Sequence, residues 1–274
     1  MVEDRVSLTD ANSTFWTELC GTTLARSIGV TDASPASLDR FDRWYFDFYP
    51  YLEKQIDFAA LAGKRVLEVG LGYGSVAQRL AAVGAIYQGL DIAPGPVAMV
   101  NHRLKQMGFP GEARQGDVLA CPFPDGSFDR VIAIGCYHHT GDLARAIAET
   151  RRVLVPGGQA TIMVYGAYSY RRWVRWFGPT ASYLLWDKLG IGAWRRTSTA
   201  ERAAYDADTS GAAAPETVFV SSSHMRRLAS EWHRVDIYRR NIGAEFPLSL
   251  IPRKYLLAVL GPLTGLDLYC QLTK

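Results

Sequence analysis

Apolar residues between positions 65 and 165 follow two periodicities that alternate along the chain. Short runs of Val, Ile and Leu, such as 66–69, are bounded by glycine or polar residues and predict buried strands. Segments such as 75–82 and 143–153 instead repeat apolar residues every three or four positions, which predicts amphipathic helices. Strands that alternate with helices predict an α/β fold built on a mostly parallel sheet.

The stretch 65–75, RVLEVGLGYGS, predicts a strand that runs into a tight glycine turn and opens a helix. Glycine suits such a turn because it adopts positive φ at little cost and leaves bare backbone toward a ligand. A dinucleotide site requires G-x-G-x-x-G/A and an acid about 20 residues later. Gly72, Gly74 and Ala77 satisfy this spacing, and Asp91 lies 19 residues after Gly72. The turn by itself therefore indicates a nucleotide without deciding which one.

Glu68 helps to decide which kind of nucleotide cofactor the turn binds. It stands two residues before Gly70 and completes the pattern E-x-G-x-G-x-G. A carboxylate here would repel a pyrophosphate, whereas it would attract a sulfonium and an ammonium group. The pattern resembles motif I of the class I S-adenosylmethionine-dependent methyltransferases, so we favour S-adenosyl-L-methionine as the cofactor. A NAD-type Rossmann oxidoreductase is the alternative.

Further landmarks of that family follow in the expected order. A second strand ends at Asp91, and a third ends near Asp117. A fourth strand is expected over 128–135, and a fifth follows an amphipathic helix and a turn at 156–158. Residues 122–129, PFPDGSFD, resemble the PF-x-D-x-SFD pattern of the ubiquinone-methyltransferase-like subgroup, methyltransferase type 11.

The resemblance implies roles for individual residues. In this family the acid at the Glu68 position helps to hold the amino-acid part of the cofactor, and the acid at the Asp91 position accepts hydrogen bonds from both ribose hydroxyls. Ile92 would flank the adenine, and Asp117 would meet the adenine amino group. The expected cofactor contacts are Glu68, Gly70, Gly72, Tyr73, Gly74, Asp91, Ile92, Asp117, Val118, Gly135, Tyr137 and Trp16.

The composition indicates which class of molecule this protein acts on. The chain has 274 residues, and its 30 Lys and Arg against 27 Asp and Glu give a formal net charge of +3. A nucleic-acid-binding protein would carry a strong basic excess, so we expect a small-molecule acceptor and no nucleic acid. The sequence is also compatible with a homodimer.

The cysteines and the N-terminal residues indicate the compartment. Cys20, Cys121, Cys136 and Cys270 show no C-x-x-C spacing, so neither a metal site nor a disulfide framework is expected. Residues 1–10 lack the build of a signal peptide, and no apolar run approaches the roughly 18 residues of a membrane helix. We therefore expect a cytoplasmic protein without stable membrane insertion.

Two segments are expected in addition to the core domain, which covers 63–165, and residues 1–62 form the first of them. Apolar stripes at helical spacing predict helices over 15–29 and 37–56. One interpretation packs these stripes on the sheet, and another makes the region a helical lid over the cofactor. The residues near the ligand would then be Trp16, Cys20, Gly21 and Tyr45.

The second additional segment is an insertion over 166–221. Its first half combines aromatic residues with arginines, which can pack on the core, cover a substrate as a cap, or contact a membrane surface or bases. Its second half is a loop longer than a simple connection requires. The arginines are Arg171, Arg172, Arg175, Arg195 and Arg196, and the expected substrate contacts are Tyr165, Tyr168, Tyr205 and Asp206.

Residues 222–274 are expected to complete the core. They predict a serine-capped helix, strands over 233–242 and 266–274, and an apolar helix over 249–263 between those strands. In the resembled family the last strand lies antiparallel between its neighbours. The expected fold class is therefore α/β, a Rossmann-like class I methyltransferase sheet of seven strands with a helical N-terminal lid and an inserted cap.

His138 and His139 follow the fourth strand, at the edge where ligands of open α/β folds bind. Holding donor and acceptor together supplies much of the acceleration of methyl transfer, ~7–11 kcal/mol in well-oriented cases. A hydroxyl acceptor also needs a base, and imidazole has a suitable pKa. We prefer His139 as the catalytic base and expect His138 to pack or to cap the next helix. The other candidate bases are His224, Asp206, Tyr137 and Tyr165.

These observations predict an S-adenosylmethionine-dependent methyltransferase that acts on a small molecule, by O-methylation of a sugar or secondary metabolite with a histidine as general base. N- or C-methylation by proximity alone is the alternative within this class, and the histidines would then only shape the site. An inactive cofactor-binding protein is an alternative outside it.

Overall fold

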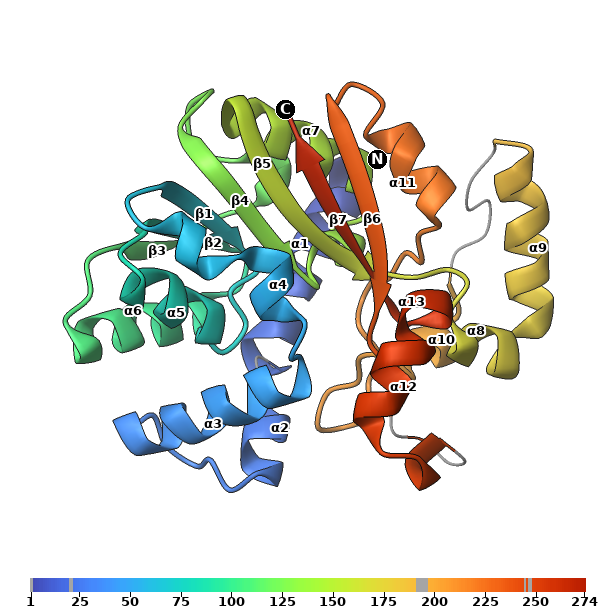
Figure 1. Ribbon diagram of the computed structural model, residues 1–274, viewed down its shortest axis with the longest axis horizontal. Coiled ribbons are helices and arrows are strands. Elements are labelled where there is room, and N and C mark those ends of the chain that lie inside the picture. Colours follow the sequence, from blue (N-terminus) through green and yellow to red (C-terminus); the bar gives the residue numbers. More distant parts are fainter. Residues whose placement is uncertain (1, 20–21, 191–196, 244, 246–247) are drawn as a thin grey trace.

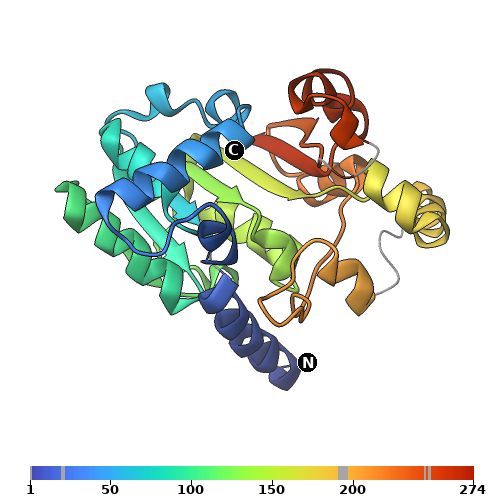
Figure 2. The same ribbon diagram turned by 90° about the horizontal axis from the view of Figure 1, so that it is seen from below.

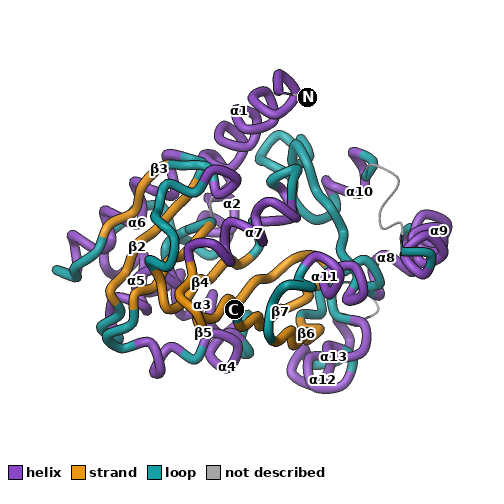
Figure 3. The backbone as a smooth tube through the Cα atoms, turned by 90° about the horizontal axis from the view of Figure 1, so that it is seen from above, coloured by secondary structure: helices purple, strands orange, loops and turns teal. Residues whose placement is uncertain are grey.

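The computed structural model describes residues 2–19, 22–190, 197–243, 245 and 248–274. Cys20, Gly21, Arg195 and Arg196, which the sequence marks as candidate lid or cap residues, lie outside these residues. The centre of the structure is one seven-stranded sheet with helices on either side (Figures 1 and 3). Its strands are β1 (Arg65–Val69), β2 (Ile86–Asp91), β3 (Glu112–Gln115), β4 (Phe128–Ile134), β5 (Leu154–Tyr165), β6 (Arg234–Arg240) and β7 (Asp267–Thr273).

The strand order is β3-β2-β1-β4-β5-β7-β6, and the first five strands along the chain pair in parallel. β7 is antiparallel to both neighbours, so that Cys270 is the register partner of Ile162 on β5 and of Ile237 on β6. The expected class I methyltransferase sheet, with its last strand inserted antiparallel, is therefore confirmed. The carboxyl ends of the parallel strands lie at the lower edge of the sheet in Figure 1.

Two apolar clusters cover the two faces of the sheet. On one face, α4 (Leu52–Ile56), η1 (Phe58–Leu61), α5 (Ser75–Ala82) and α6 (Pro94–Met107) bury side chains against Val66 and Ile132. On the other face, α7 (Leu143–Val153) and α11 (Ser222–Leu228) pack against Leu67 and Val131. Adjacent residues of β1 thus point to opposite faces, as the pleat of a strand requires.

The glycine turn at 156–158 is part of β5, whereas the sequence predicts that it precedes the strand. Phe128 on β4 is the register partner of Leu154, and the next pair joins Arg130 to Gln159, so the register shifts across the glycines. Gly157 has a φ of +75°, which lets the strand bulge here without ending.

The N-terminal region is more helical than the apolar stripes predict. It contains α1 (Val2–Leu19), α2 (Thr22–Ser27) and α3 (Pro35–Phe48) before α4. The helix predicted from residue 15 therefore begins at Val2, and the one predicted over 37–56 is divided between α3 and α4. Figure 2, which looks onto the carboxyl ends of the parallel strands, shows α3 crossing in front of them and α1 projecting outward.

The insertion leaves β5 and returns to the same strand end. It carries α8 (Tyr170–Arg175), α9 (Phe177–Lys188) and α10 (Thr199–Ala203). On its return, the Val220 amide donates to the Tyr165 carbonyl over 2.8 Å, and the Ala167 amide donates to the Val220 carbonyl over 2.9 Å. The last residues of the insertion are thereby fixed beside the carboxyl end of β5.

The segment predicted as one helix over 249–263 is divided into three by its prolines. It forms η4 (Leu248–Leu250), α12 (Arg253–Val259) and α13 (Gly261–Thr264), with Pro252 preceding α12 and Pro262 lying in the first turn of α13. Proline lacks the N–H that a continuous helix needs. Among the described residues, none of the helices has the length and apolar character needed to cross a bilayer.

Candidate functional site

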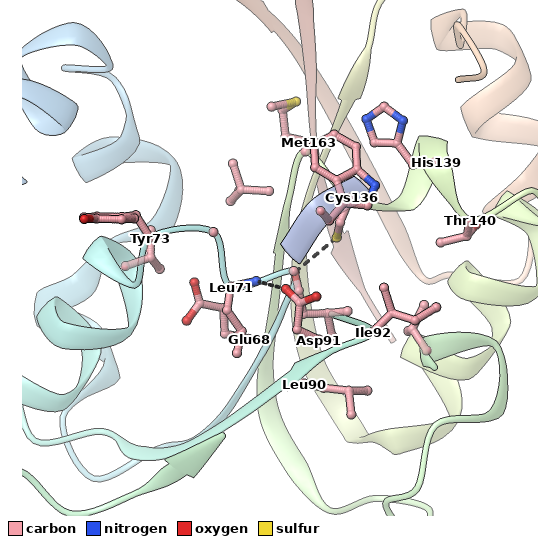
Figure 4. Close-up of a pocket in the computed structure, with 18 of the residues that line it drawn as sticks. Glu68, Leu71, Tyr73, Leu90, Asp91, Ile92, Cys136, His139, Thr140 and Met163 are labelled. Atoms are coloured by element: carbon pink, nitrogen blue, oxygen red, sulfur yellow. Dashed lines mark hydrogen bonds between the residues drawn. The ribbon is translucent and has the colours of Figure 1, made fainter. Parts of the chain in front are cut away.

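A cavity of about 370 Å³ lies at the carboxyl ends of β1, β2 and β4, and we call it the strand-end cavity (Figure 4). Open α/β sheets bind their ligands at this edge, and the size suits a small molecule. The cavity is lined by Thr9, Asn12, Trp16, Phe41, Tyr45, Tyr49, Glu68, Val69, Gly70, Leu71, Gly72, Tyr73, Ser75, Val76, Leu90, Asp91, Ile92, Gly116, Asp117, Val118, Ile134, Gly135, Cys136, His139, Thr140, Met163 and Tyr269.

The turn between β1 and α5 forms the floor of the strand-end cavity. Gly70 has a φ of +76°, and a Cβ atom there would lie 2.5 Å from the Cβ of Cys136. Gly72 has a φ of +53°, and a Cβ there would meet no atom within 4 Å, because the backbone faces open space. A ligand can therefore approach bare backbone at Gly72. Gly74 opens α5 and does not line the cavity, since its Cα faces Arg103.

Glu68 presents a buried carboxyl group to the cavity from the end of β1. One oxygen accepts a hydrogen bond of 2.8 Å from the hydroxyl of Tyr87 on β2. Burial raises the pKa of Glu68 to about 8, although the bond from Tyr87 opposes this shift. Among the described residues Glu68 forms no ion pair, and the more distant charge of Arg103 offsets only part of the effect of burial.

Asp91 ends β2 and lies next to Glu68 in the cavity (Figure 4). Its carboxylate accepts hydrogen bonds from the amides of Leu71, at 2.7 Å, and Ala93, at 2.9 Å. These bonds fix the orientation of both oxygens, and each keeps a lone pair for a further donor. Burial raises the pKa of Asp91, and the backbone bonds oppose that rise.

The remaining expected cofactor contacts divide into two groups. Tyr73, Ile92, Asp117, Val118 and Gly135 line the strand-end cavity, where apolar side chains from different strand ends face one another. Tyr137 does not line it. The Tyr137 ring is fully buried in the core below, and its hydroxyl lies 2.6 Å from the Thr150 hydroxyl.

These residues fit S-adenosylmethionine better than a dinucleotide. In its ionised form the Glu68 carboxyl at the end of β1 would attract the cofactor's ammonium group, whereas it would repel a pyrophosphate. Asp91 offers two oriented oxygens to a diol, and the open space at Gly72 admits a ligand against the backbone. Among the described residues, no cluster of His, Cys, Asp and Glu could hold a metal ion.

The two histidines after β4 occupy different environments. His139 lines the cavity and is 3% exposed, whereas His138 is completely buried and does not line it. Burial lowers the pKa of His138 well below its usual range, and neither of its ring nitrogens has a hydrogen-bond partner among the described residues. The His138 ring instead contacts the rings of His139 and Tyr165, with centroids 4.1 Å from each and the ring planes tilted.

The His139 ring lies between two segments of the insertion. Its Nδ1 atom is 2.7 Å from the Glu216 carbonyl oxygen, and its Nε2 atom is 3.6 Å from Oδ2 of Asp206. A carbonyl can only accept, so Nδ1 carries the hydrogen and Nε2 keeps a lone pair in the neutral ring. Burial lowers the pKa of His139, while the charge of Asp206 opposes that shift.

Asp206 and Tyr165 meet behind His139, outside the lining of the strand-end cavity. The Tyr165 hydroxyl donates to Asp206 over 3.1 Å, and burial raises the pKa of the Asp206 carboxyl. Tyr168 and Tyr205 lie elsewhere. The Tyr168 hydroxyl donates to Asp187 on α9 over 2.8 Å, and the Tyr205 hydroxyl lies 3.1 Å from that of Ser169.

The N-terminal helices close one side of the cavity. Trp16 on α1 lies with its ring centroid 4.7 Å from that of His139, and Asn12 donates to the His139 carbonyl over 2.9 Å. Phe41 and Tyr45 on α3 also line the cavity, and Phe41 contacts Tyr73 of the glycine turn at 4.4 Å between centroids.

Sequence reasoning missed several residues at this site. Met163 and Tyr269 face each other across the β5–β7 ladder and line the cavity, and strand-end positions would have been a signal for both. Asn12 belongs to no sequence motif that would have identified it as a residue of this site. Asp267 begins β7 opposite Tyr165, and burial raises its pKa to about 7.

Comparison with known proteins identifies the core. Residues 67–162 match the family described as a methyltransferase domain. A demethylmenaquinone methyltransferase from Thermus thermophilus is 35% identical over 106 residues, which cover 38% of this chain and 48% of that protein. A sterol 24-C-methyltransferase from Gibberella zeae is 34% identical over 135 residues, 48% of this chain and 34% of that protein.

A ubiquinone biosynthesis O-methyltransferase from Pseudomonas putida is 35% identical over 103 residues, 37% of this chain and 44% of the relative. The chain thus spans about half the length, or less, of these curated relatives.

Solved structures share the fold at low sequence identity. An S-adenosylmethionine-dependent methyltransferase from Methanosarcina mazei superposes with a TM-score of 0.54 at 15% identity, covering 80% of this chain and 96% of that one. One from Thermotoga maritima gives a TM-score of 0.51 at 16% identity, covering 86% and 95%. These likenesses concern the fold alone.

Proposed function

Because this chain carries a class I methyltransferase domain, we propose that it transfers a methyl group from S-adenosylmethionine to a small, partly apolar molecule. One observation carries the proposal: two buried carboxyl groups, Glu68 and Asp91, flank a glycine turn at the floor of a cavity whose other walls are largely aromatic. The carboxyl groups suit the polar parts of the cofactor, and the aromatic walls suit an acceptor.

Glu68, Asp91 and Asp117 would hold the cofactor by its ammonium, ribose and adenine groups respectively. When bound, the cofactor supplies an electrophilic methyl group on a positively charged sulfur. The protein must then position the acceptor and exclude water, which is the principal catalytic contribution to such a displacement. Trp16, Tyr45 and the other N-terminal residues of the cavity would exclude water as a lid.

His139 is the proposed general base for an acceptor hydroxyl. The Glu216 carbonyl fixes its tautomer, so that the Nε2 lone pair is free to accept a proton. Asp206, 3.6 Å from Nε2, would stabilise the imidazolium that forms. Burial lowers the pKa of His139, which keeps the ring neutral and ready to accept that proton.

The acceptor class follows from the walls of the cavity. Trp16, Phe41, Tyr45, Tyr49, Met163 and Tyr269 are apolar or aromatic. We therefore favour O-methylation of a secondary metabolite with an apolar ring or chain over an unsubstituted sugar. The names of the quinone and sterol methyltransferases among the relatives agree with an apolar acceptor.

C-methylation is the second candidate, and the environment of His139 favours it specifically. Both ring nitrogens of His139 face protein groups, so the ring could serve only to shape the cavity. The relatives include a sterol 24-C-methyltransferase. In this case proximity would drive the methyl transfer, and the proton that the acceptor loses would pass to water or to a group other than His139.

Calorimetric titration with S-adenosylhomocysteine tests the cofactor. We expect saturable binding that Asp91→Ala abolishes or strongly weakens, because the ribose would lose its acceptor. The absence of heat, together with clear binding of NAD, would reject the proposal in favour of an oxidoreductase. Binding without turnover on any acceptor offered would instead indicate an inactive cofactor-binding protein.

A pair of variants tests the base once an acceptor is found. His139→Ala should lower turnover about 100-fold or more while the affinity for S-adenosylhomocysteine changes little, because general-base catalysis contributes on that scale. Asp206→Asn should lower it less. If turnover of His139→Ala matches the wild type and NMR of the product shows a new C–CH₃ group, C-methylation replaces O-methylation.

A further inference from the structure

A second cavity, of about 600 Å³, lies at the amino ends of β1, β4 and β5, and we call it the basic cavity. The segment from α4 to η1 forms one wall, and β6 forms another. None of its lining residues belongs to the strand-end cavity, which lies at the other end of β1 and β4. The proposed methyl transfer leaves this cavity without a role.

The floor of the basic cavity is a polar patch on an otherwise apolar sheet face. Arg130 donates to Gln159 over 2.5 Å, to Thr161 over 2.7 Å and to Gln271 over 3.3 Å. Gln271 in turn donates to the backbone carbonyl of Gln55 on α4 over 2.7 Å. The guanidinium is therefore held in one orientation by side chains from two strands, β5 and β7.

Arg130 brings a buried positive charge to this floor without an ionic partner. Its side chain belongs to a residue that is 8% exposed, and its hydrogen-bond acceptors are all neutral. Within the described part of the chain, no carboxylate lies within ion-pair distance of it, and the charge of Asp57 acts on it only from farther away. Burial lowers the pKa of the guanidinium to about 10, so it still carries its charge at neutral pH. A buried charge of this kind is costly unless an anion compensates it.

The mouth of the basic cavity adds further cationic groups. Lys54, Lys64 and Arg240 line it, together with two carboxylates, Asp57 and Asp129. Asp129 is already neutralised by an ion pair of 2.9 Å with Arg65, which lies outside the lining. The cations therefore outnumber the available carboxylates, and the cavity favours an anionic ligand.

We propose that the basic cavity binds a phosphate group, either inorganic phosphate or the monoester of a small molecule, with Arg130 as the buried anchor. A planar guanidinium matches the geometry of phosphate oxygens, and Lys54 and Lys64 at the mouth add point charges. The site is separate from the proposed cofactor and acceptor sites. The two proposals are therefore tested independently: loss of phosphate binding would not argue against methyl transfer, and absence of methyl transfer would not argue against phosphate binding.

Calorimetric titration of the full chain with inorganic phosphate, at constant ionic strength, tests this site. The wild type should show saturable binding, and Arg130→Gln should weaken it by at least about tenfold, because the buried anchor is lost. Arg226→Gln is the matched control, since Arg226 is exposed on α11 and does not line the cavity. The control should bind phosphate as the wild type does.

Two further measurements keep the test decisive. Lys54→Gln with Lys64→Gln changes only exposed side chains, and this double variant should also weaken phosphate binding if Arg130→Gln fails to fold. S-adenosylhomocysteine affinity should be unchanged in every folded variant, because the two cavities share no residue. Glycerol 3-phosphate that binds more tightly than phosphate would assign a monoester, and equal or weaker binding would assign free phosphate.

Three outcomes would overturn the proposal. The first is the absence of saturable heat with the wild type, and the second is unchanged phosphate binding in Arg130→Gln or in the double lysine variant. The third is an equal loss in Arg226→Gln, which would show that phosphate responds only to the overall charge of the protein.

Discussion

Burial determines the protonation state of Glu68, and with it the role that this residue can take. Its pKa is raised to about 8 because the carboxyl is removed from water, and the hydrogen bond from Tyr87 offsets only part of this effect. Without a cationic ligand the group therefore keeps its proton at neutral pH. A bound ammonium would favour the carboxylate and lower this pKa.

The first prediction at the residue scale concerns stability against pH. The pKa of Glu68 is higher in the folded than in the unfolded chain, so its contribution to stability is fully present below about pH 4.5 and is lost as pH rises toward 8. The slope is at most ~1.4 kcal/mol per pH unit. Urea unfolding at several pH values should show this decline, and Glu68→Gln should make it shallower, with the remainder due to other buried acids such as Asp267. Parallel curves for both proteins would contradict the assignment.

At the scale of the element, one acidic side chain joins α3 to the glycine turn. Asp42 accepts a hydrogen bond of 2.5 Å from the Ser75 hydroxyl at the start of α5, and it forms an ion pair of 2.9 Å with Arg103 on α6. Arg103 is fully buried, so Asp42 neutralises a charge that has lost its water. This contact holds the helix that carries Phe41 and Tyr45 against the strand-end cavity.

We therefore predict that Asp42→Ala destabilises the fold by roughly 2–4 kcal/mol, because it leaves a buried cation unpaired. It should also speed the release of S-adenosylhomocysteine, measured by stopped-flow fluorescence, since α3 is loosened. Asp39→Ala is the control on the same helix. Asp39 pairs with Arg43 at the surface, and its loss should cost under about 1 kcal/mol and leave release unchanged. Similar effects of the two variants would argue against the link through α3.

At the scale of the whole molecule, a buried ion pair holds the helices of the insertion together. Arg172 on α8 lies 3.1 Å from Glu201 on α10, and both side chains are almost fully buried. The guanidinium also lies over the ring of Phe219, 4.0 Å from its centroid. These contacts join the two ends of the insertion beside β5 (Figure 1) and so fix the return segment that meets the histidines.

The third prediction follows from this arrangement. Glu201→Gln keeps an acceptor for the first turn of α10 but removes the charge, so Arg172 becomes a buried cation without a partner. We expect a loss of roughly 3–5 kcal/mol and faster amide exchange over 197–220 than in β1 and β4. Glu231→Gln, at a residue paired with Arg151 at the surface, should change neither quantity measurably. Uniformly faster exchange throughout the sheet would contradict a local role.

Much of the fold and of the cofactor side could be predicted because the signals are local. Strand and helix periods, the glycine turn and the acids at the ends of β1 and β2 lie within short stretches of chain, and parallel strands bring their carboxyl ends to one edge. Glu68, Gly72, Asp91 and Ile92 consequently line one cavity. Tyr137 shows the limit of this reasoning, because the short η3 (Tyr137–His139) turns its ring into the core while His139 faces the cavity.

The sequence by itself therefore determined the alternation of strands and helices, the glycine turn and the carboxyl groups beside it, since each depends on residues close together in the chain. Only the tertiary structure decided what surrounds His139. Trp16, Asp206 and Glu216 reach it from helices and loops far away in the sequence, and no local period records such contacts. The same holds for Arg130, whose neutral hydrogen-bond partners are brought together by the packing of three strands.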